Sequence, residues 1–384
     1  MTLRPRIAIA HDYLTQRGGA EKVVLAMARA FPEAPIYTTL YESATTFPEF
    51  AGMDIRTSPL NKIAVVRQHH RAGLPVLPFA ASAMKIDADL VLVSSSGWAH
   101  GFRTTGRKLV YCYTPARWLY QTRVYLGDTA PVGTRLVAAV LTRPLRAWDR
   151  RAARSADRYL AISSAVRERI HAVYGIDASV LPAPPSAVTS LPVQPVDELR
   201  TWAGGGDFYL CIARLLAYKN VDTVISAFAG GPRNLVIVGA GPQEPVLRRL
   251  ATDHILMVKN LTDAQMRWLY QHCRAVISAA YEDYGLTPLE GAGFGKPSVL
   301  LRWGGFLDTM VEGVTCVYFE EPDPTQIAAA VDQCEAATWD PDAIAGHVEK
   351  LDEAHFARAL HGAVDQLLAA GPDPAPLPRE AGRP

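Results

Sequence analysis

The chain has 384 residues, of which 49% are hydrophobic and 20% are charged, and its formal net charge is +1. This length exceeds what one hydrophobic core usually supports, so we predict two domains. No apolar run approaches the roughly 18 residues needed to span a membrane, and no secretory signal precedes the first strand-like segment. We therefore expect a globular cytoplasmic protein.

The near-neutral net charge hides two oppositely charged halves. Residues 1–185 contain 24 Lys and Arg against 13 Asp and Glu, a balance of +11, whereas residues 186–384 contain 15 against 25, a balance of −10. Such asymmetry indicates a surface that meets an anion, namely nucleic acid, phospholipid headgroups or a phosphorylated substrate. The five cysteines are widely spaced without a CxxC pair, which predicts buried, reduced thiols and no metal site.

In the first half, short apolar runs alternate with segments of helical periodicity, which is typical of a parallel sheet built from βαβ units. The first unit consists of a strand at 6–10, a glycine-containing loop and an amphipathic helix at 20–31. Further strands are predicted at 36–40, 90–95, 108–113 and 158–163.

A proline-rich stretch follows, with five prolines between residues 182 and 195, and we interpret it as an interdomain linker because proline disrupts helices and central strands. A second series of strands is predicted at 207–213, 234–239, 254–258, 275–280 and 297–301. The sequence thus predicts an α/β protein of two doubly wound parallel-sheet domains that face a cleft, where such sheets bind ligands at the carboxyl ends of their strands. The predicted domains are 1–185 and 186–345, followed by a helix within 346–370 and a disordered Pro- and Gly-rich tail at 371–384.

The segment "AYEDYGLTPLEG" at 280–291 follows a predicted strand and allows two interpretations. In the first, Thr287 is an N-cap, Pro288 occupies the first helical position, and Glu290 completes a capping box. In the second, backbone N–H groups of Gly285, Leu286 and Thr287 hold a diphosphate at the positive end of the helix. Glu290 would then accept hydrogen bonds from a ribose diol.

Two cations follow the first strand of the second half. Arg214 and Lys219 occupy a loop, and Asn220 can cap the helix that begins at Val221. Cations at the carboxyl end of a strand suit a diphosphate, since each charge-assisted hydrogen bond contributes roughly 1.5–3 kcal/mol. Solvated loop charges are the alternative.

The ordered set of motifs in the second half resembles the nucleotide-sugar-binding half of family 4 glycosyltransferases. The set comprises Arg214-x4-Lys219, "VGAGP" at 238–242, Glu282-x7-Glu290 with "GLTPLEG", and "GKPSVLLRWGGFLDTMVEG" at 295–313. In the first half, "RGGAEKVV" and "YCYTPARWLY" resemble the acceptor half of the same family, and most closely its O-antigen mannosyltransferase branch. The resemblance covers about residues 5–365.

This resemblance implies the GT-B architecture, in which two Rossmann-like domains face a cleft and a final helix, here near 350–370, packs on the first domain. It also implies sugar transfer with retention, without a bound metal or another cofactor. Arg214 and Lys219 match the residues that bind the donor diphosphate. Glu290 matches the carboxylate that binds ribose, and Glu282 matches the one placed against the donor sugar.

Five further residues in loops are predicted to belong to the site. Gly18 and Gly19 open the first helix and would let the backbone approach the donor phosphates or the acceptor. Asp12, beside this glycine loop, is a catalytic candidate. We also include Gly239 and Lys259 among the donor-binding residues, although Gly239-x-Gly241 lacks the third glycine of a dinucleotide fingerprint and by itself favours a tight turn.

One residue departs from the pattern of the family. The related motif reads "YCHTP", whereas this chain has Tyr113 in place of the histidine. A phenol can donate a hydrogen bond but does not readily carry positive charge, because its pKa is near 10. Tyr113 is therefore either a catalytic residue or a core tyrosine. His11 and His100 could similarly line the cleft or serve as buried structural histidines.

The basic first half suggests what the acceptor is attached to. Cations and apolar residues are mixed at 61–79, and nine arginines lie within 135–169. This pattern predicts peripheral attachment to an anionic membrane surface, with a polyprenyl-diphosphate-linked sugar as acceptor. A solvated arginine-rich face is the alternative. Nucleic acid is not an expected partner, because no aromatic stacking platform accompanies the cations.

The sequence and the resemblance thus predict a hexosyltransferase that uses a nucleotide sugar. We expect it to move mannose from GDP-mannose to a lipid-linked or small glycoside acceptor at the inner face of the cell membrane. Alternatives are a secondary-metabolite glycosyltransferase with a soluble acceptor, a sugar-nucleotide epimerase or hydrolase, and a catalytically degenerate protein of the same fold that binds nucleotide sugars.

Overall fold

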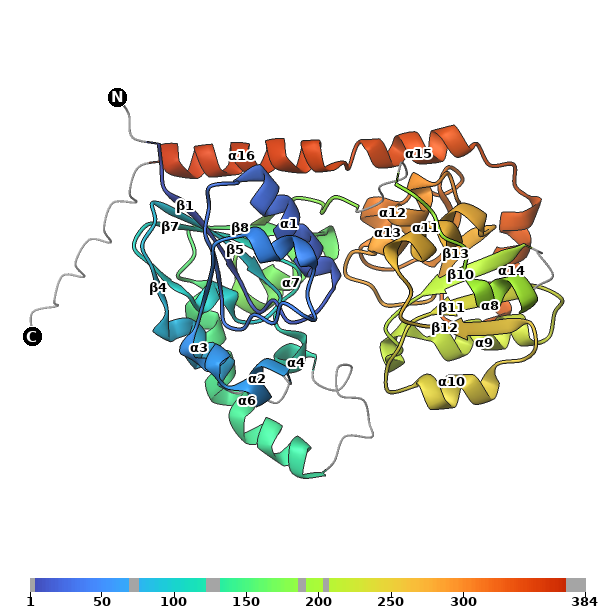
Figure 1. Cartoon of the computed structure of the whole chain (residues 1–384), viewed down its shortest axis with the longest axis horizontal. Coiled ribbons are helices and arrows are strands. Elements are labelled where there is room, and N and C mark those ends of the chain that lie inside the picture. Colours follow the sequence, from blue (N-terminus) through green and yellow to red (C-terminus); the bar gives the residue numbers. More distant parts are fainter. Residues whose placement is uncertain (1–3, 69–75, 122–131, 186–190, 203–206, 371–384) are drawn as a thin grey trace, which may run out of the picture.

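A computed structural model of the chain describes residues 4–68, 76–121, 132–185, 191–202 and 207–370. Two parallel β-sheets form the centres of two α/β halves, as Figure 1 shows. The predicted pair of Rossmann-like domains is therefore confirmed. The predicted tail at 371–384 and part of the predicted linker lie outside the described residues.

The first sheet has seven parallel strands in the order β3-β2-β1-β5-β7-β8-β9. Chain order reverses between β1 and β5, so the loops that follow these two strands border a switch point where ligands can bind. The strands are β1 (Ile7–His11), β2 (Ile36–Thr38), β3 (Ile55–Thr57), β5 (Leu90–Ser95), β7 (Arg107–Cys112), β8 (Arg158–Ala161) and β9 (Ala178–Val180).

Helices and short turns connect these strands. Strand β5 is buried along all six residues, as expected for a central strand covered on both faces. The connecting elements are α1 (Gly19–Ala30), η1 (Pro48–Gly52), η2 (Pro59–Lys62), α2 (Ala64–Gln68), α3 (Leu77–Ala83), η4 (Ala99–Gly101), α4 (Arg117–Tyr120), α6 (Val132–Ala153) and α7 (Ser164–Tyr174), with a small pair formed by β4 (Lys85–Ile86) and β6 (Arg103–Thr104).

The second sheet has six parallel strands in the order β12-β11-β10-β13-β14-β15. Its switch point lies between β10 and β13, so the loops after these strands border a second position where ligands can bind. The strands are β10 (Phe208–Ile212), β11 (Asn234–Val238), β12 (Ile255–Val258), β13 (Ala275–Ser278), β14 (Ser298–Leu301) and β15 (Cys316–Phe319). Its helices are α8 (Asp197–Trp202), η5 (Ala217–Lys219), α9 (Val221–Ala229), α10 (Glu244–Leu250), α11 (Asp263–His272), α12 (Leu286–Gly293), α13 (Phe306–Thr309) and α14 (Pro324–Ala336).

Two final helices, α15 (Pro341–Glu349) and α16 (Glu353–Ala369), run along both halves. Helix α16 lies along the first half beside α1, and α15 lies near the second (Figure 1). The Phe356 ring packs edge-on against Tyr111 at 5.7 Å between centroids, and Arg158 donates to the Gln366 side chain at 2.8 Å. Helix α16 is thereby packed on the first sheet.

The predicted strands are all present, but the edge strands β3, β9 and β15 and the short pair β4 and β6 escaped prediction. Strands β3 and β9 have three residues each and are half-buried or exposed, so they lack the apolar run of a central strand. All five cysteines are buried free thiols, as predicted. Among the helices that the structure describes, none has both the length and the hydropathy needed to cross a bilayer.

Candidate active site

Arg214 follows β10 at the switch point of the second sheet. Its side chain is exposed, and its Nη2 lies 3.4 Å from the Tyr218 hydroxyl. In the part of the chain that the structure describes, no carboxylate pairs with this guanidinium. Its charge therefore faces solvent at the end of the sheet where α/β domains bind ligands.

The turn that carries Arg214 packs against a glycine pair. A Cβ atom on Gly239 would lie 1.9 Å from the carbonyl oxygen of Ala213, and one on Gly241 would lie 2.4 Å from that of Leu215. No side chain fits at either position because the neighbouring atoms belong to the backbone. Close packing against the loop after β10 therefore requires both glycines, and a turn follows them, in which the Glu244 N–H donates to the Gly241 carbonyl oxygen at 3.0 Å.

Lys219 is buried in η5 beside Arg214, with 8% of its surface exposed. Its Nζ contacts the Glu282 carboxylate and lies 4.9 Å from the centroid of the Tyr218 ring. Burial, together with the charges of Arg117 and Arg214, lowers the pKa of Lys219 well below its usual value. The positive charge concentrated here is therefore only partly balanced by nearby carboxylates, and this excess favours the binding of an anion.

The helix predicted after Asn220 is present as α9, but the predicted side-chain cap is wrong. Asn220 adopts a left-handed conformation with φ of 49°, and its Nδ2 donates to the carbonyl oxygen of Ala279 at 2.8 Å. The side chain thus joins the loop after β10 to the loop after β13. It holds the two loops of the switch point together.

Helix α12 begins two residues earlier than the capping-box interpretation requires. Gly285 is the N-cap, with φ of 91°, and Leu286 is the first helical residue. Thr287 therefore lies within the first turn, and its side chain does not cap the helix. Glu290 falls at the fifth helical position, out of reach of the N-cap. The capping-box interpretation is wrong, because a positive-φ glycine ends the loop before Thr287.

Glu290 instead contacts groups outside its own helix. Its Oε2 accepts a hydrogen bond from the Tyr270 hydroxyl at 2.7 Å, and its Oε1 pairs with Nζ of Lys22 at 3.0 Å. Lys22 belongs to α1, so this ion pair joins the two halves. A carboxylate has about four lone-pair sites, so Glu290 can still accept hydrogen bonds from a diol.

The loop that carries Glu282 rests on a second glycine pair, whose role the sequence did not reveal. A Cβ on Gly304 would lie 2.2 Å from the carbonyl oxygen of Glu282, and one on Gly305 would lie 2.2 Å from the Cα of Tyr284. The Gly305 N–H also donates to the Glu282 carbonyl at 3.0 Å. The "GG" after β14 therefore fixes the backbone at Glu282.

The glycine loop of the first half faces this site. Gly18 is the N-cap of α1, and a Cβ on Gly19 would lie 2.8 Å from Cδ1 of Leu286. The amino-terminal ends of α1 and α12 are thus adjacent. The structure brings together most of the predicted site: Gly18 and Gly19 with Gly285, Leu286 and Glu290, and Arg214 with Lys219 and Glu282.

Lys259 lies apart from this group. Its Nζ pairs with Glu244 at 2.9 Å, and its side chain is 45% exposed. None of its described contacts reaches Arg214 or Lys219. Its predicted role in donor binding therefore lacks support from the geometry.

Asp12 is buried and its carboxylate is fully engaged. Oδ2 accepts from the N–H and hydroxyl of Ser96 at 2.6 and 2.9 Å, and Oδ1 accepts from the N–H groups of Trp98 and Ala99 at 2.8 and 2.6 Å. Asp12 therefore holds the loop after β5 in place. This arrangement favours a positioning role over the predicted catalytic one.

Tyr113 lies beneath the start of α1. Its hydroxyl donates to the carbonyl oxygen of Ala20 at 3.2 Å and lies 2.8 Å from Oγ of Ser94, which is also 2.9 Å from Nδ1 of His11. Burial raises the pKa of Tyr113 well above 10 and lowers that of His11. This neutral network favours the structural interpretation of both residues.

His100 lies in a different buried network. Its Nε2 is 2.9 Å from Oδ1 of Asp149, and the Tyr120 hydroxyl donates to the other carboxylate oxygen at 2.8 Å. Both His100 and Asp149 are almost completely buried. The geometry thus supports a structural histidine.

Glu21 is a residue that sequence analysis missed, although it lies within the quoted motif "RGGAEKVV". It is 1% exposed, its Oε1 accepts from Gln16 at 3.1 Å, and its buried Oε2 has no hydrogen-bond partner in the described structure. Burial raises the pKa of Glu21 to about 7. A Cβ on Gly18 would lie 2.6 Å from Oε2, so this glycine makes room for the carboxyl group.

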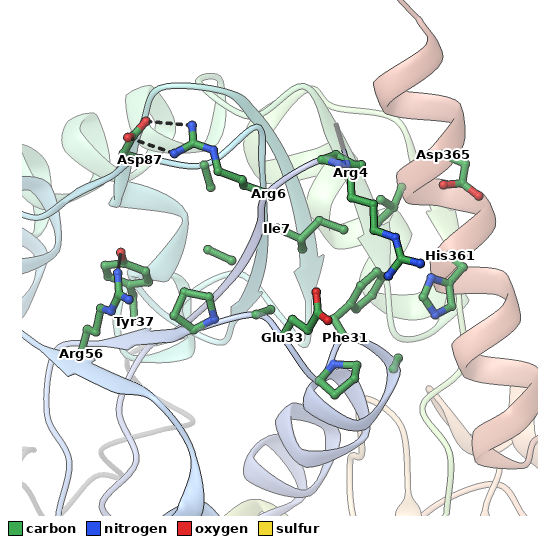
Figure 2. Close-up of a pocket in the computed structure, with 18 residues that line it drawn as sticks. Arg4, Arg6, Ile7, Phe31, Glu33, Tyr37, Arg56, Asp87, His361 and Asp365 are labelled. Carbon is green, nitrogen blue, oxygen red and sulfur yellow. Dashed lines mark hydrogen bonds and ion pairs between the residues drawn. The ribbon is translucent and has the colours of Figure 1, made fainter. Parts of the chain in front are cut away.

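A cavity of about 670 Å³ lies elsewhere, at the edge of the first sheet where β1 begins. Figure 2 shows Arg6 paired with Asp87 on its wall and Arg4 beside His361 of α16. None of the predicted site residues lines it. The cavity is therefore separate from the candidate active site.

Comparison with known families agrees with this geometry. One family model, "Glycosyltransferase Family 4", matches residues 17–184, and a second, "Glycosyl transferases group 1", matches residues 200–344. The chain belongs to the family 4 glycosyltransferases. The two matches fall on the two sheets, so both halves of this glycosyltransferase contain family sequence.

Two curated relatives of this glycosyltransferase are mannosyltransferases. The O-antigen chain mannosyltransferase C of Escherichia coli is 31% identical over 107 residues, which are 26% of this chain and 29% of the relative. The GDP-mannose-dependent alpha-(1-6)-phosphatidylinositol monomannoside mannosyltransferase of Mycolicibacterium smegmatis is 27% identical over 207 residues, which are 47% of this chain and 54% of the relative. The aligned part thus spans about half or less of these relatives.

Solved structures share the fold of this glycosyltransferase. Sucrose-phosphate synthase from Thermosynechococcus elongatus has a TM-score of 0.67 and 17% identity, covering 96% of this chain and 100% of that one. HepE from Anabaena, in complex with UDP-glucose, has a TM-score of 0.66 and 16% identity, covering 94% and 100%. These neighbours establish the GT-B fold.

Glu21 predicts a specific pH dependence of stability. Its pKa of about 7 in the folded protein exceeds the ordinary 4.5, so the folded state binds this proton more tightly and stability falls as pH rises through that window. We expect Glu21→Gln to remove this loss. Relative to wild type, the variant should gain up to about 3 kcal/mol in the free energy of unfolding between pH 4 and pH 8.

Urea denaturation at both pH values measures this difference. Glu168→Gln, at an exposed position on α7, is the control and should follow wild type at both pH values. A constant difference between Glu21→Gln and wild type across the window would contradict the assignment.

Proposed function

We propose that this protein is a hexosyltransferase that moves mannose from GDP-mannose to an acceptor hydroxyl with retention and without a resident metal ion. The names of the two mannosyltransferase relatives support the sugar, and one of them also supports GDP-mannose as donor. The nucleotide-sugar complex of HepE supports a donor of this class. Retention and metal independence rest on the family resemblance.

The observation that carries the proposal is the clustering of Arg214 and Lys219 near the amino-terminal end of α12 at one switch point. A departing nucleoside diphosphate develops negative charge, and prearranged cations and N–H groups stabilise it without reorganisation. Arg214 is exposed and has no described carboxylate partner, so it can bind the diphosphate directly. Glu290, four residues into α12 from Leu286, is suitably placed for the ribose of the same nucleotide.

Glu282 has a separate role in this proposal. Its carboxylate contacts the Lys219 ammonium, and glycines 304 and 305 hold its backbone. Such a carboxylate can accept hydrogen bonds from sugar hydroxyls and stabilise positive charge that develops at the anomeric carbon. Lys219 would thus link the group that holds the sugar to the group that holds the diphosphate.

The first test is nucleotide binding. We expect Arg214→Ala to weaken GDP binding at least about tenfold, because one charge-assisted contact to the diphosphate is lost. Isothermal titration of wild type and variant with GDP, UDP and ADP measures this effect and the base preference. Arg274→Ala, just before β13 at the opposite edge of the sheet, is the matched control and should bind as wild type does.

Binding of no nucleotide by the folded wild-type protein would overturn the donor site. Preference for UDP or ADP over GDP would instead reject GDP-mannose while leaving the diphosphate site intact.

The second test separates chemistry from binding. We expect Glu282→Gln to lower kcat about 10²-fold or more, because the charge facing the sugar is lost. GDP should bind equally well or more tightly, since Lys219 loses its carboxylate partner and remains available to the diphosphate. Transfer of labelled mannose and calorimetry measure the two quantities.

Glu320→Gln is the control for Glu282→Gln, because Glu320 is an exposed carboxylate paired only with Arg302 among its described contacts. Unchanged turnover in Glu282→Gln would show that this carboxylate does not act on the sugar.

We further propose that the first domain attaches to an anionic membrane surface and uses a polyprenyl-diphosphate-linked acceptor. Four large apolar side chains around α2 and α3 are exposed, between 47% and 65%. Helix α6 lies beside α3, since Trp148 donates to Ser82 at 2.9 Å, and exposed arginines lie in α6 and directly after it. The apolar residues are Ile63, Val65, Val76 and Phe79, and the arginines are Arg143, Arg150, Arg151 and Arg154.

Vesicle sedimentation tests this attachment. Apolar side chains would enter the interface while arginines meet anionic headgroups, so wild type should bind phosphatidylglycerol-containing vesicles and lose binding in high salt. The double variant Val65→Asp/Phe79→Asp should bind at least about tenfold more weakly. Val246→Asp, at an exposed site on α10, should bind as wild type does. Equal loss in both variants, or no binding by wild type, would reject the membrane surface.

A further inference from the structure

Asp283, directly after Glu282, connects the two domains. Its side chain belongs to the loop after β13 and is 8% exposed. Oδ2 accepts from Nη2 and Nε of Arg117 at 2.5 and 3.0 Å, and Oδ1 accepts from Nη1 of Arg169 at 2.8 Å. Both oxygens are therefore held by arginines of the first domain.

The two arginines come from neighbouring elements of the first sheet. Arg117 begins α4 after β7, and Arg169 lies on α7 after β8, and β7 pairs with β8. Arg169 is oriented further by a hydrogen bond to Oγ1 of Thr114 at 2.7 Å. The carboxyl end of the first sheet thus presents a preformed pair of cations to a single carboxylate.

Arg117 also reaches the other loop of the donor site. Its guanidinium carbon lies 5.2 Å from the centroid of the Tyr218 ring, and Tyr218 directly precedes Lys219. The same side chain therefore contacts the residue beside Glu282 and the residue beside Lys219. These two positions carry the sugar-facing carboxylate and the buried ammonium of the proposed site.

The charges make this contact costly to break. Burial raises the pKa of Asp283, but the charges and hydrogen bonds of Arg117 and Arg169 outweigh it and leave that pKa below its usual value. Asp283 is thus an anion in the folded protein. Removing one partner of such a buried cluster leaves an uncompensated charge, so the geometry depends on all three groups.

We propose that Arg117 and Arg169 are positioning residues for the transfer reaction, which act through Asp283 to hold Glu282 in its reactive orientation when the two domains are docked. This inference rests on the proposed glycosyltransferase function. Because the contact is made by the backbone neighbour of Glu282, loss of docking would displace that carboxylate even though none of its described contacts involves a first-domain residue. Transfer would then require the acceptor-binding domain to be in place.

A second contact between the domains provides a matched control. The Ser164 N–H at the start of α7 donates to Oδ2 of Asp308 on α13 at 2.7 Å. This contact uses the same first-domain helix as Arg169 but adjoins neither Glu282 nor Lys219. If the contact at Asp283 served only to hold the domains together, its loss should therefore change kcat as little as loss of the contact at Asp308 does.

The test compares Asp283→Asn, Arg169→Gln, their double variant and Asp308→Asn in the full chain. We expect Asp283→Asn to lower kcat for mannose transfer about 10²-fold, the size of effect that follows a displacement of about 1 Å in a reacting group. The Kd for GDP, which Arg214 and Glu290 bind from the second domain, should change by less than about threefold. Arg169→Lys should recover most of the activity lost in Arg169→Gln.

The double variant distinguishes a shared contact from two independent effects. If Arg169 acts through Asp283, the double variant should be within about twofold of Asp283→Asn, whereas independent sites would multiply their losses. Asp308→Asn should retain wild-type kcat. Circular dichroism and the thermal midpoint establish that each variant is folded, and a variant that unfolds is replaced by Arg117→Lys, which keeps the charge and removes the bidentate geometry.

The outcomes separate the two proposals. Absence of transfer by wild type would overturn the proposed function and the inference together. Three outcomes, each with transfer intact in the wild type, would overturn only the positioning role. They are an unchanged kcat in Asp283→Asn, multiplicative losses in the double variant, and a loss in Asp308→Asn equal to that in Asp283→Asn.

Discussion

The structure depends on how it accommodates positive charge at the switch point of the second sheet. Lys219 is buried beside Arg117 and Arg214, and burial disfavours its charged form. Two carboxylates, Glu282 and Asp283, lie next to these cations. The cluster therefore holds cations close together but only partly compensated, which is the electrostatic condition that the proposed binding of a diphosphate requires.

Glycines make this arrangement geometrically possible. At 239 and 304 a side chain would collide with backbone carbonyl oxygens, and at 19 it would collide with Leu286 of the opposite half. At 239 and 304 the site loop is thus pressed against another segment of main chain, where no rotamer change can relieve a clash, whereas at 19 the neighbour is the Leu286 side chain. The loops that carry Arg214 and Glu282 are fixed by backbone packing, which leaves their side chains available for substrate.

Sequence analysis was successful where the signal was local or lay in an ordered set of motifs. Apolar runs located the central strands, and the ordered motifs identified the family and singled out Arg214, Lys219 and Glu282, which the structure brings together. It failed where the answer depended on long-range contacts. The capping box at Thr287 was plausible from spacing alone, but the φ of Gly285 and the distant partners Lys22 and Tyr270 determine where α12 begins and what Glu290 contacts.

Sequence analysis also failed to predict the partners of buried polar groups. Asp12, His11 and Tyr113 have the residue types and positions of catalytic groups, yet each is engaged by a donor or acceptor of β5 or of the loop that follows it.

The tyrosine at position 113 changes the charge beneath the glycine loop. A protonated histidine there would place a cation under the amino-terminal end of α1, which already carries partial positive charge. Tyr113 is a neutral hydrogen-bond donor, so it braces Ala20 without adding to that charge. The titrating group near this helix end is then Glu21, whose charge is coupled favourably to Arg214 and unfavourably to Asp12. In the proposed donor site, an ionised Glu21 would compete with the diphosphate for the positive charge of Arg214. A carboxyl group with a pKa of about 7 therefore suits the proposed binding of an anion there.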